Sequence, residues 1–153
     1  MALELRPGWT SALRRLAEQG VARAETALEV LAVELEDTAR QRASNGIHAY
    51  GTPTPARPGE GPAEISGTLK ESIGHTRPIK DLLGWEMKVG PRVGFTPPYG
   101  RRQTSADQYG YFLETGLRNG TTYPWLKPSV DLVRPKSGTI LARVLNETPW
   151  ATF

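Results

Sequence analysis

The chain of 153 residues contains no cysteine and only two histidines. Without cysteine it has no disulfide framework, no thiolate zinc site and no cysteine nucleophile. No stretch approaches the roughly 18 consecutive apolar residues of a membrane-spanning helix. Residues 1–8 also lack the cationic start and apolar run of a signal peptide. These absences exclude disulfide-rich and membrane-spanning classes of protein.

Catalytic and metal-binding patterns are equally scarce. His48 lies in a proline-rich segment and His75 at the start of an expected strand. No His-Glu-x-x-His pair and no Gly-x-Ser-x-Gly elbow is present. Ser105 and Asp107 complete a triad with His75 only on paper, because triads are recognised by geometry and not by composition. We therefore predict a protein that is not an enzyme and that needs no metal or cofactor.

Charge is distributed unevenly along the chain, which has a net charge of +3. Residues 1–76 carry 8 Lys and Arg against 10 Asp and Glu, whereas residues 77–153 carry 11 against 6. An excess of basic residues permits contact with acidic partners, including DNA phosphates, but most such surfaces are simply solvated. Arg101 and Arg102, in a polar loop over 97–108, are candidate contacts to phosphate or to an acidic protein surface.

Residues 10–42 read as one long amphipathic helix. Apolar residues recur there at alternating steps of three and four, which places them on one stripe. The stripe consists of Ala17, Val21, Ala24, Leu28, Leu31, Leu35 and Ala39. A helix of this length is close to 50 Å long, more than the diameter of a small domain. We expect most of it to lie across a sheet and part of the stripe to bury against another chain.

Residues 44–64 form a proline-rich segment that cannot hold a regular element, because proline fixes φ and donates no N–H. We expect a long extended loop that a neighbouring chain orders. Tyr50, Pro53, Pro55 and Arg57 are its candidate contacts to a partner or to DNA.

The rest of the chain predicts short helices around a small antiparallel sheet. A short helix is expected over 66–73 with Gly74 ending it, and further helices over 109–114, 128–133 and 140–145. Alternation over 85–89 and at Val93 and Phe95 predicts a β-hairpin that turns at Gly90–Pro91, with an edge strand over 75–79. The fold class is therefore α+β, in a single domain over 1–153.

Glu114 is the acid of greatest interest, since it ends an aromatic helix just before a Thr-Gly pair. One interpretation is an acid in a cleft. The favoured one is a carboxylate that accepts nearby backbone N–H groups or pairs with Arg118. The aromatic residues around it, including Tyr109 and Trp125, can stack on nucleic-acid bases, but core packing is their more common role.

Three segments resemble the tail-completion, or neck, family of long-tailed bacteriophages. The family shows a Thr-Gly-x-Leu-Arg-x-Ser-Ile segment, then Tyr-Ala-x-x-x-Glu-x-Gly-Thr, then Pro-Phe-Leu-x-Pro-Ala. Here the order and spacing of the three segments are similar over residues 65–128. The matching residues are Gly67, Leu69, Ser72, Ile73, Tyr109, Glu114, Gly116, Pro124, Trp125, Leu126 and Pro128. The proline-rich insert at 44–64 and Pro135 depart from the family pattern.

The resemblance implies an α+β domain with a long helix and a non-enzymatic structural role in the virion. Such a protein joins DNA-filled heads to tails as a ring component, with sixfold symmetry expected. The implied partners are other copies of the chain and neighbouring connector, stopper, terminator or tail-tube proteins. Packaged DNA in the channel is a further candidate partner. The implied location is the head–tail junction, assembled in the host cytoplasm, without a membrane.

The alternative hypothesis comes from the residues alone. The basic second half and the Arg101–Arg102 pair are compatible with a small nucleic-acid-binding domain, whose DNA affinity would fall steeply with salt.

Overall fold

The computed structural model describes residues 9–48, 56–80, 84–96 and 104–147, with the side chains of the first helix described at 14, 15 and from 17 onward. The helices are α1 (Trp9–Arg42), α2 (Thr68–Ser72), α3 (Ala106–Thr115), α4 (Leu126–Val133) and α5 (Ser137–Glu147), with a 3-10 turn η1 (Arg134–Lys136) joining the last two. The strands are β1 (Ile73–His75), β2 (Ile79–Lys80), β3 (Trp85–Glu86) and β4 (Val89–Pro91). The predicted α+β class is confirmed.

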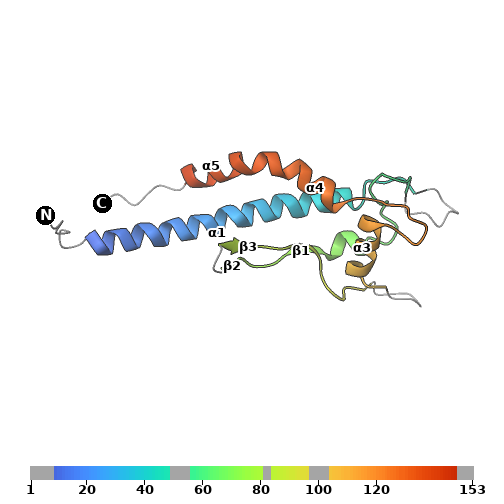
Figure 1. Cartoon of the computed structure of the whole chain (residues 1–153), viewed down its shortest axis with the longest axis horizontal. Coiled ribbons are helices and arrows are strands. Elements are labelled where there is room, and N and C mark those ends of the chain that lie inside the picture. The colour runs from blue at the N-terminus through green and yellow to red at the C-terminus, as the bar shows by residue number, and fades with distance from the viewer. Residues whose placement is uncertain (1–8, 49–55, 81–83, 97–103, 148–153) are drawn as a thin grey trace.

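The long helix α1 is the axis of the molecule, and the other elements lie along it (Figure 1). Helices α4 and α5 run back along one side of α1, antiparallel to it, and the strands lie along the opposite side. Helix α3 sits at the end where α1 finishes. The strands thus lie along one side of α1, as expected. The sequence did not predict that α4 and α5 cover the opposite side.

The strands form one long, irregular antiparallel hairpin over 73–91. Ile73 pairs with Pro91 and His75 with Val89, and further out Ile79 pairs with Glu86. The predicted turn at Gly90–Pro91 is wrong, since both residues lie inside β4. The turn falls between β2 and β3. Burial explains the difference, because this register turns Ile73, which is 1% exposed, into the core and leaves Val93, 90% exposed, outside the sheet.

The short helices lie close to their predicted places, with shifted ends. Helix α2 ends at Ser72, so Gly74 lies in a strand and does not end the helix as expected. Helix α3 starts at Ala106, three residues before the predicted start at Tyr109. Helix α4 starts at Leu126, so Pro128 is its third residue and not its first. Pro135 interrupts the helical run, as predicted, through the 3-10 turn η1.

The proline-rich segment holds no helix or extended strand in its described parts, as predicted. Residues 56–64 make backbone contacts within their own chain, and the expected contact of the loop with a neighbouring chain stays a prediction. Asn45 forms an isolated bridge with Ala63, and the N–H of Gly59 donates to Thr122 O at 3.0 Å. Because these backbone groups find partners within the chain, the described loop is closed at its base.

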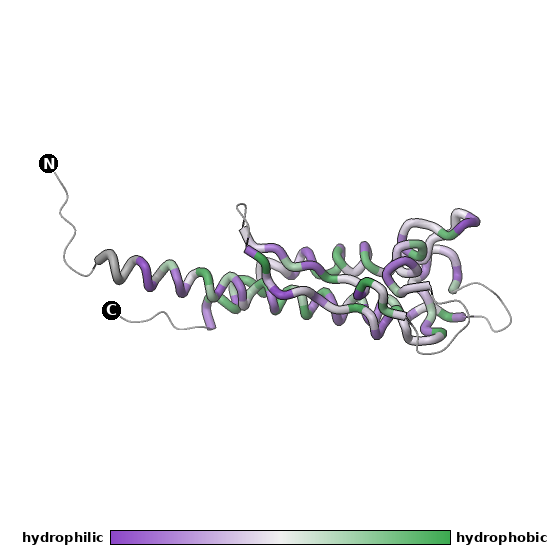
Figure 2. Tube along the Cα trace, turned by 90° about the horizontal axis from the view of Figure 1, so that it is seen from below, coloured by the Kyte–Doolittle hydropathy of each residue, from purple (hydrophilic) through white to green (hydrophobic). Residues whose placement is uncertain are grey.

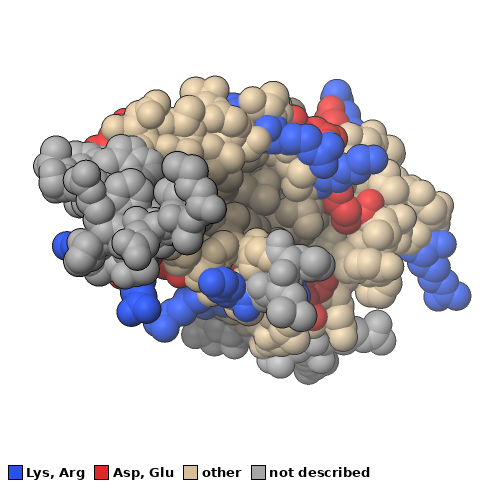
Figure 3. Space-filling view, turned by 60° about the vertical axis from the view of Figure 1, so that its left-hand side comes forward, with Lys and Arg blue, Asp and Glu red and all other residues tan. Residues whose placement is uncertain are grey.

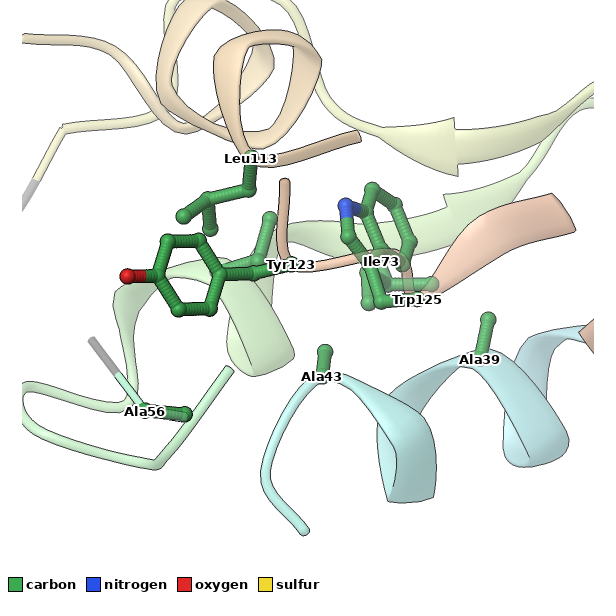
Figure 4. Close-up of a cluster of buried hydrophobic side chains, with 8 residues drawn as sticks. Ala39, Ala43, Ala56, Ile73, Leu113, Tyr123 and Trp125 are labelled. Carbon is green, nitrogen blue, oxygen red and sulfur yellow. The ribbon is translucent and has the colours of Figure 1, made fainter. Parts of the chain in front are cut away.

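The core lies where α1 ends and meets α2, β1, α3 and the segment leading into α4 (Figure 4). Trp125, Tyr123 and Leu113 are at most 1% exposed and pack over two alanines, Ala39 of α1 and Ala43 directly after its end. The small side chains let the aromatic rings approach the helix backbone. Each large side chain buried here stabilises the fold by about 1.5–3 kcal/mol.

Candidate functional site

The residues that carry the family resemblance meet in one corner between α2, α3 and α4. Its centre is Glu114 on α3, whose carboxylate accepts three backbone N–H groups at the start of α4. Trp125 N and Leu126 N donate to Oε2 at 2.8 and 2.9 Å, and Lys127 N donates to Oε1 at 2.9 Å. The next residue, Pro128, has no N–H. The free donors at this helix start are therefore fully accounted for.

This arrangement confirms the favoured interpretation of Glu114 as a carboxylate that holds backbone groups. A negative charge at a helix N-terminus also interacts favourably with the helix dipole. The alternative partner Arg118 makes no salt bridge with Glu114 among the described residues. Glu114 thus fixes the angle at which α4 leaves the core.

Trp125 is locked from its other side. Its indole Nε1 donates to Gly110 O at 3.1 Å. A side chain at Gly110 would place its Cβ 2.9 Å from Leu69 Cδ1 and 3.3 Å from Trp125 Cζ2, so glycine is needed for α3 to approach α2 and the indole. The corner is a structural joint, and the aromatic ring is not a free platform for stacking on a base.

The remaining residues of the resemblance have structural places in the same corner. Gly67 precedes α2 with φ of 73° and Gly116 ends α3 with φ of 132°, a backbone conformation that favours glycine. Ser72 is fully buried and its hydroxyl donates to Leu69 O at 2.6 Å. Pro124 is half-buried in the segment that leads into α4.

Most of the residues predicted to contact a partner fall outside the described part of the chain. These are Tyr50, Pro53, Pro55, Arg101 and Arg102. Arg57 is described and lies exposed at the base of the proline-rich loop. Its exposure is compatible with a contact to a partner.

Two titratable groups of α3 have shifted pKa values. The Ser105 hydroxyl and then the Gly94 N–H, which donates to Asp107 Oδ1 at 3.1 Å, lower the pKa of Asp107. Burial, and then the neighbouring Tyr123 phenol, raise the pKa of Tyr109 above its ordinary value. Both shifts follow from how α3 is anchored to the segments around it.

His75 ties the hairpin to α1. Its Nδ1 lies 2.5 Å from Glu36 Oε2, and the other oxygen of Glu36 lies 2.6 Å from Arg40 Nη2. Arg40 Nη2 also donates to Ile73 O at 2.9 Å. His75 is therefore paired with Glu36 of α1 and does not form a catalytic triad with Ser105 and Asp107. Within the described ranges, no group of three or more histidine and acidic side chains is arranged to hold a metal, and no helix is long and apolar enough to cross a membrane.

An apolar groove runs along α1 between the hairpin and α4, and we call it the α1 groove. Leu28, Leu31 and Leu35 of α1 form its floor. Figure 3 shows one face of the molecule, with a central hollow among uncharged residues and charged residues of both signs around it. Its remaining lining residues are Ala32, Met87, Val89, Val130, Val133 and Arg134. The cavity measures about 190 Å³, room for a few aliphatic side chains.

The N-terminal part of α1, residues 9–22, projects past the end of α5, as Figures 1 and 2 show from two directions. Near the end of α5, Arg23 Nη1 donates to Leu145 O at 3.5 Å. The stripe of the α1 groove continues through Ala24 onto this overhang, where it includes Val21 and Ala17, and all three residues are exposed. The apolar stripe of α1 from Ala17 to Leu35 is therefore continuous, and we call it the seam: it lines the α1 groove at Leu28–Leu35 and is exposed at Ala17–Ala24.

The stripe was read correctly as a pattern, but sequence reasoning missed which residues are covered. Arg23, Ala27 and Ala32 are buried off the predicted stripe. Arg23 contacts α5, and Ala32 lines the α1 groove beside Leu31. The groove walls from the hairpin and α4 lie more than 50 residues away in the sequence, and no local pattern in α1 indicates them.

Comparisons of the chain with protein-family models, with curated proteins and with solved structures found no match.

Proposed function

We propose that this chain is a structural protein of the head–tail junction of a long-tailed bacteriophage, without catalytic activity, that joins DNA-filled heads to tails as one subunit of a ring. The identity of the family rests on the sequence resemblance. The observation that carries the proposal is that its scattered residues converge on one interlocked joint, with Glu114, Trp125 and Pro128 in complementary roles. Because residues from the three resembling segments contact one another in the fold, we interpret the segments as one motif.

The surface of α1 supports the assembly part of the proposal. A ring needs a contact in which one surface of a subunit meets a different surface of the next. The overhang offers an exposed apolar stripe through Val21, and the α1 groove offers an apolar hollow over Leu31. In each, the stripe spans eight residues, 17–24 and 28–35, so both are about 10 Å long.

The partners proposed for such a ring are other copies of this chain, expected as a hexamer, and the adjoining connector, stopper, terminator or tail-tube proteins. The isolated chain is expected to be monomeric or weakly associating, because a single seam of this length buries little area compared with stable interfaces.

The test is deletion of the gene from the phage that encodes it. Full heads and complete tails that remain unjoined, seen by electron microscopy of the lysate, are the expected result. Expression of the intact chain from a plasmid serves as the control and should restore joined particles. Normal infectious particles from the deletion would refute the proposal.

A further inference from the structure

Two glycines of the hairpin face each other across its two strands. Gly74 of β1 pairs directly with Gly90 of β4. Their neighbours Ile73 and His75 point inward, the first into the core and the second to Glu36. Since side chains alternate across a strand, both glycines lie on the outer face. We call this pair the glycine face.

Nothing in the fold requires glycine at either position. Neither residue has a positive φ, unlike Gly67 or Gly116. A Cβ built at Gly74 or Gly90 meets no atom within 4 Å, whereas one at Gly110 would press on Leu69. Glycine inside a strand weakens it, and it often marks a bulge, a tight bend or the close approach of a ligand or another backbone.

The surroundings of the glycine face are basic. Lys88 and Arg92 lie two residues before and after Gly90, on the same outer face. With Thr76 they border a hollow of about 310 Å³ that hairpin residues alone line. From residue 73 to residue 92, the sequence carries four basic side chains (Arg77, Lys80, Lys88, Arg92) and two acidic side chains (Asp81, Glu86).

The two flanking cations differ in how firmly they are held. Arg92 is fixed, since its Nη2 donates to Glu71 O at 3.0 Å and its guanidinium lies 4.6 Å from the centre of the Phe95 ring. The Lys88 side chain is 72% exposed, with its Nζ 3.3 Å from Glu86 Oε1. An anionic backbone can therefore lie against the strands at the two glycines, with the held Arg92 and the exposed Lys88 beside it.

We propose that the glycine face binds the phosphodiester backbone of duplex DNA without reading its sequence. Phosphates are the partner that matches both features: they need close approach to backbone and they are neutralised by Lys and Arg. The assignment deepens the proposed function, on which it rests for the source of the DNA, by naming the surface that faces the DNA channel.

The first experiment measures binding of a short random-sequence duplex to the full chain by fluorescence anisotropy at low salt. Gly74→Ala and Gly90→Val are expected to weaken binding by about tenfold each, because a side chain keeps phosphates away from the strands. Their melting temperatures should stay equal to the wild type or rise, since the new side chains meet no atom and favour a strand. Gly138→Ala on α5, where a Cβ likewise meets nothing, is the matched control and should bind as the wild type does.

The second experiment tests the cations by the salt dependence of the same binding. Lys88→Ala is expected to reduce the slope of log affinity against log salt by about 1. Lys136→Ala removes another exposed lysine from an ion pair, with Glu34 at 2.8 Å, but on the helical side of the molecule, and should leave the slope unchanged.

Several outcomes would overturn the inference. One is DNA affinity that the glycine variants leave unchanged while they remain folded. Another is equal loss in the Gly138 and Lys136 controls. Binding of polyglutamate in preference to DNA would show an acidic protein partner instead. Failure of these tests leaves the head–tail joining role standing, because the deletion experiment measures joining and not DNA contact.

Discussion

At the scale of single residues, this protein is organised by polar side chains that satisfy backbone groups. Glu114 is the clearest case, since three N–H groups converge on its two oxygens. Ser72 and Ser129 act similarly, each returning its hydroxyl to a carbonyl one turn back. Such contacts stabilise mainly because leaving a buried donor or acceptor unpaired is costly.

Replacing Glu114 should therefore destabilise the fold, because its carboxylate has a structural role at the start of α4. Glu114→Ala leaves three backbone N–H groups at the start of α4 without their acceptor. It is expected to lower the free energy of unfolding by about 2–3 kcal/mol. Glu114→Gln keeps one acceptor oxygen and should cost about half as much. Urea denaturation followed by circular dichroism measures both. Equal stability of the alanine variant and the wild type would contradict the structural role.

Tyr109 predicts the response to alkaline pH. Because burial raises its pKa in the folded state, the unfolded chain loses the proton first as pH rises. The stabilising contribution is complete below the ordinary phenol pKa of about 10 and is lost above it. Tyr109→Phe should therefore flatten the fall of unfolding free energy above pH ~10. Tyr111→Phe, which removes an exposed phenol from the same helix, is the control.

At the scale of elements, α1 is continuous over 34 residues although Gly20 lies within it. A Cβ at that position meets no atom within 4 Å, so tertiary packing does not require the glycine. Its presence weakens this part of α1, because glycine has a low helix propensity.

Gly20→Ala is expected to stabilise α1 by up to about 1 kcal/mol, through helix propensity and reduced freedom of the unfolded chain. Thermal unfolding and the helical circular dichroism signal measure the change. Gly46→Ala is the contrasting variant, because a Cβ there would overlap Gly61 O and Ala63 N, and it should destabilise. A rise in stability for both variants would contradict the packing described.

At the scale of the whole molecule, the long axis and the apolar seam of α1 favour a subunit that joins others. The seam is half-covered over Leu28–Leu35 and uncovered over Ala17–Ala24. A subunit with an exposed stripe at one end and a hollow further along can contact copies head to tail, which closes into a ring or extends into a filament.

Val21→Glu should abolish this self-association, because it places a charge in the middle of the stripe. Analytical ultracentrifugation over a range of concentrations measures the association. The matched control is Val33→Glu, a substitution on the same helix at a residue that is also exposed, 44% against 38%, but off the stripe. Loss of association in both variants, or in neither, would refute a specific role for the seam.

How much of this could be predicted from the sequence depends on how far apart the interacting residues lie. The long helix follows from the three-and-four spacing of its apolar residues, and the role of Glu114 follows from its position before a turn. The α1 groove could not be predicted, because Met87 and Val130 reach α1 only through the folded arrangement. The predicted turn at Gly90–Pro91 failed for the same reason.

The sequence by itself determined the α+β class, the long amphipathic helix, the break at Pro135 and the irregular proline-rich segment, because each depends on local backbone chemistry. Only the tertiary structure decided the register of the hairpin, the face of α1 that is covered and the outward position of Gly74 and Gly90. Short strands satisfy alternation in more than one register, and burial of Ile73 against α1 selects one of them.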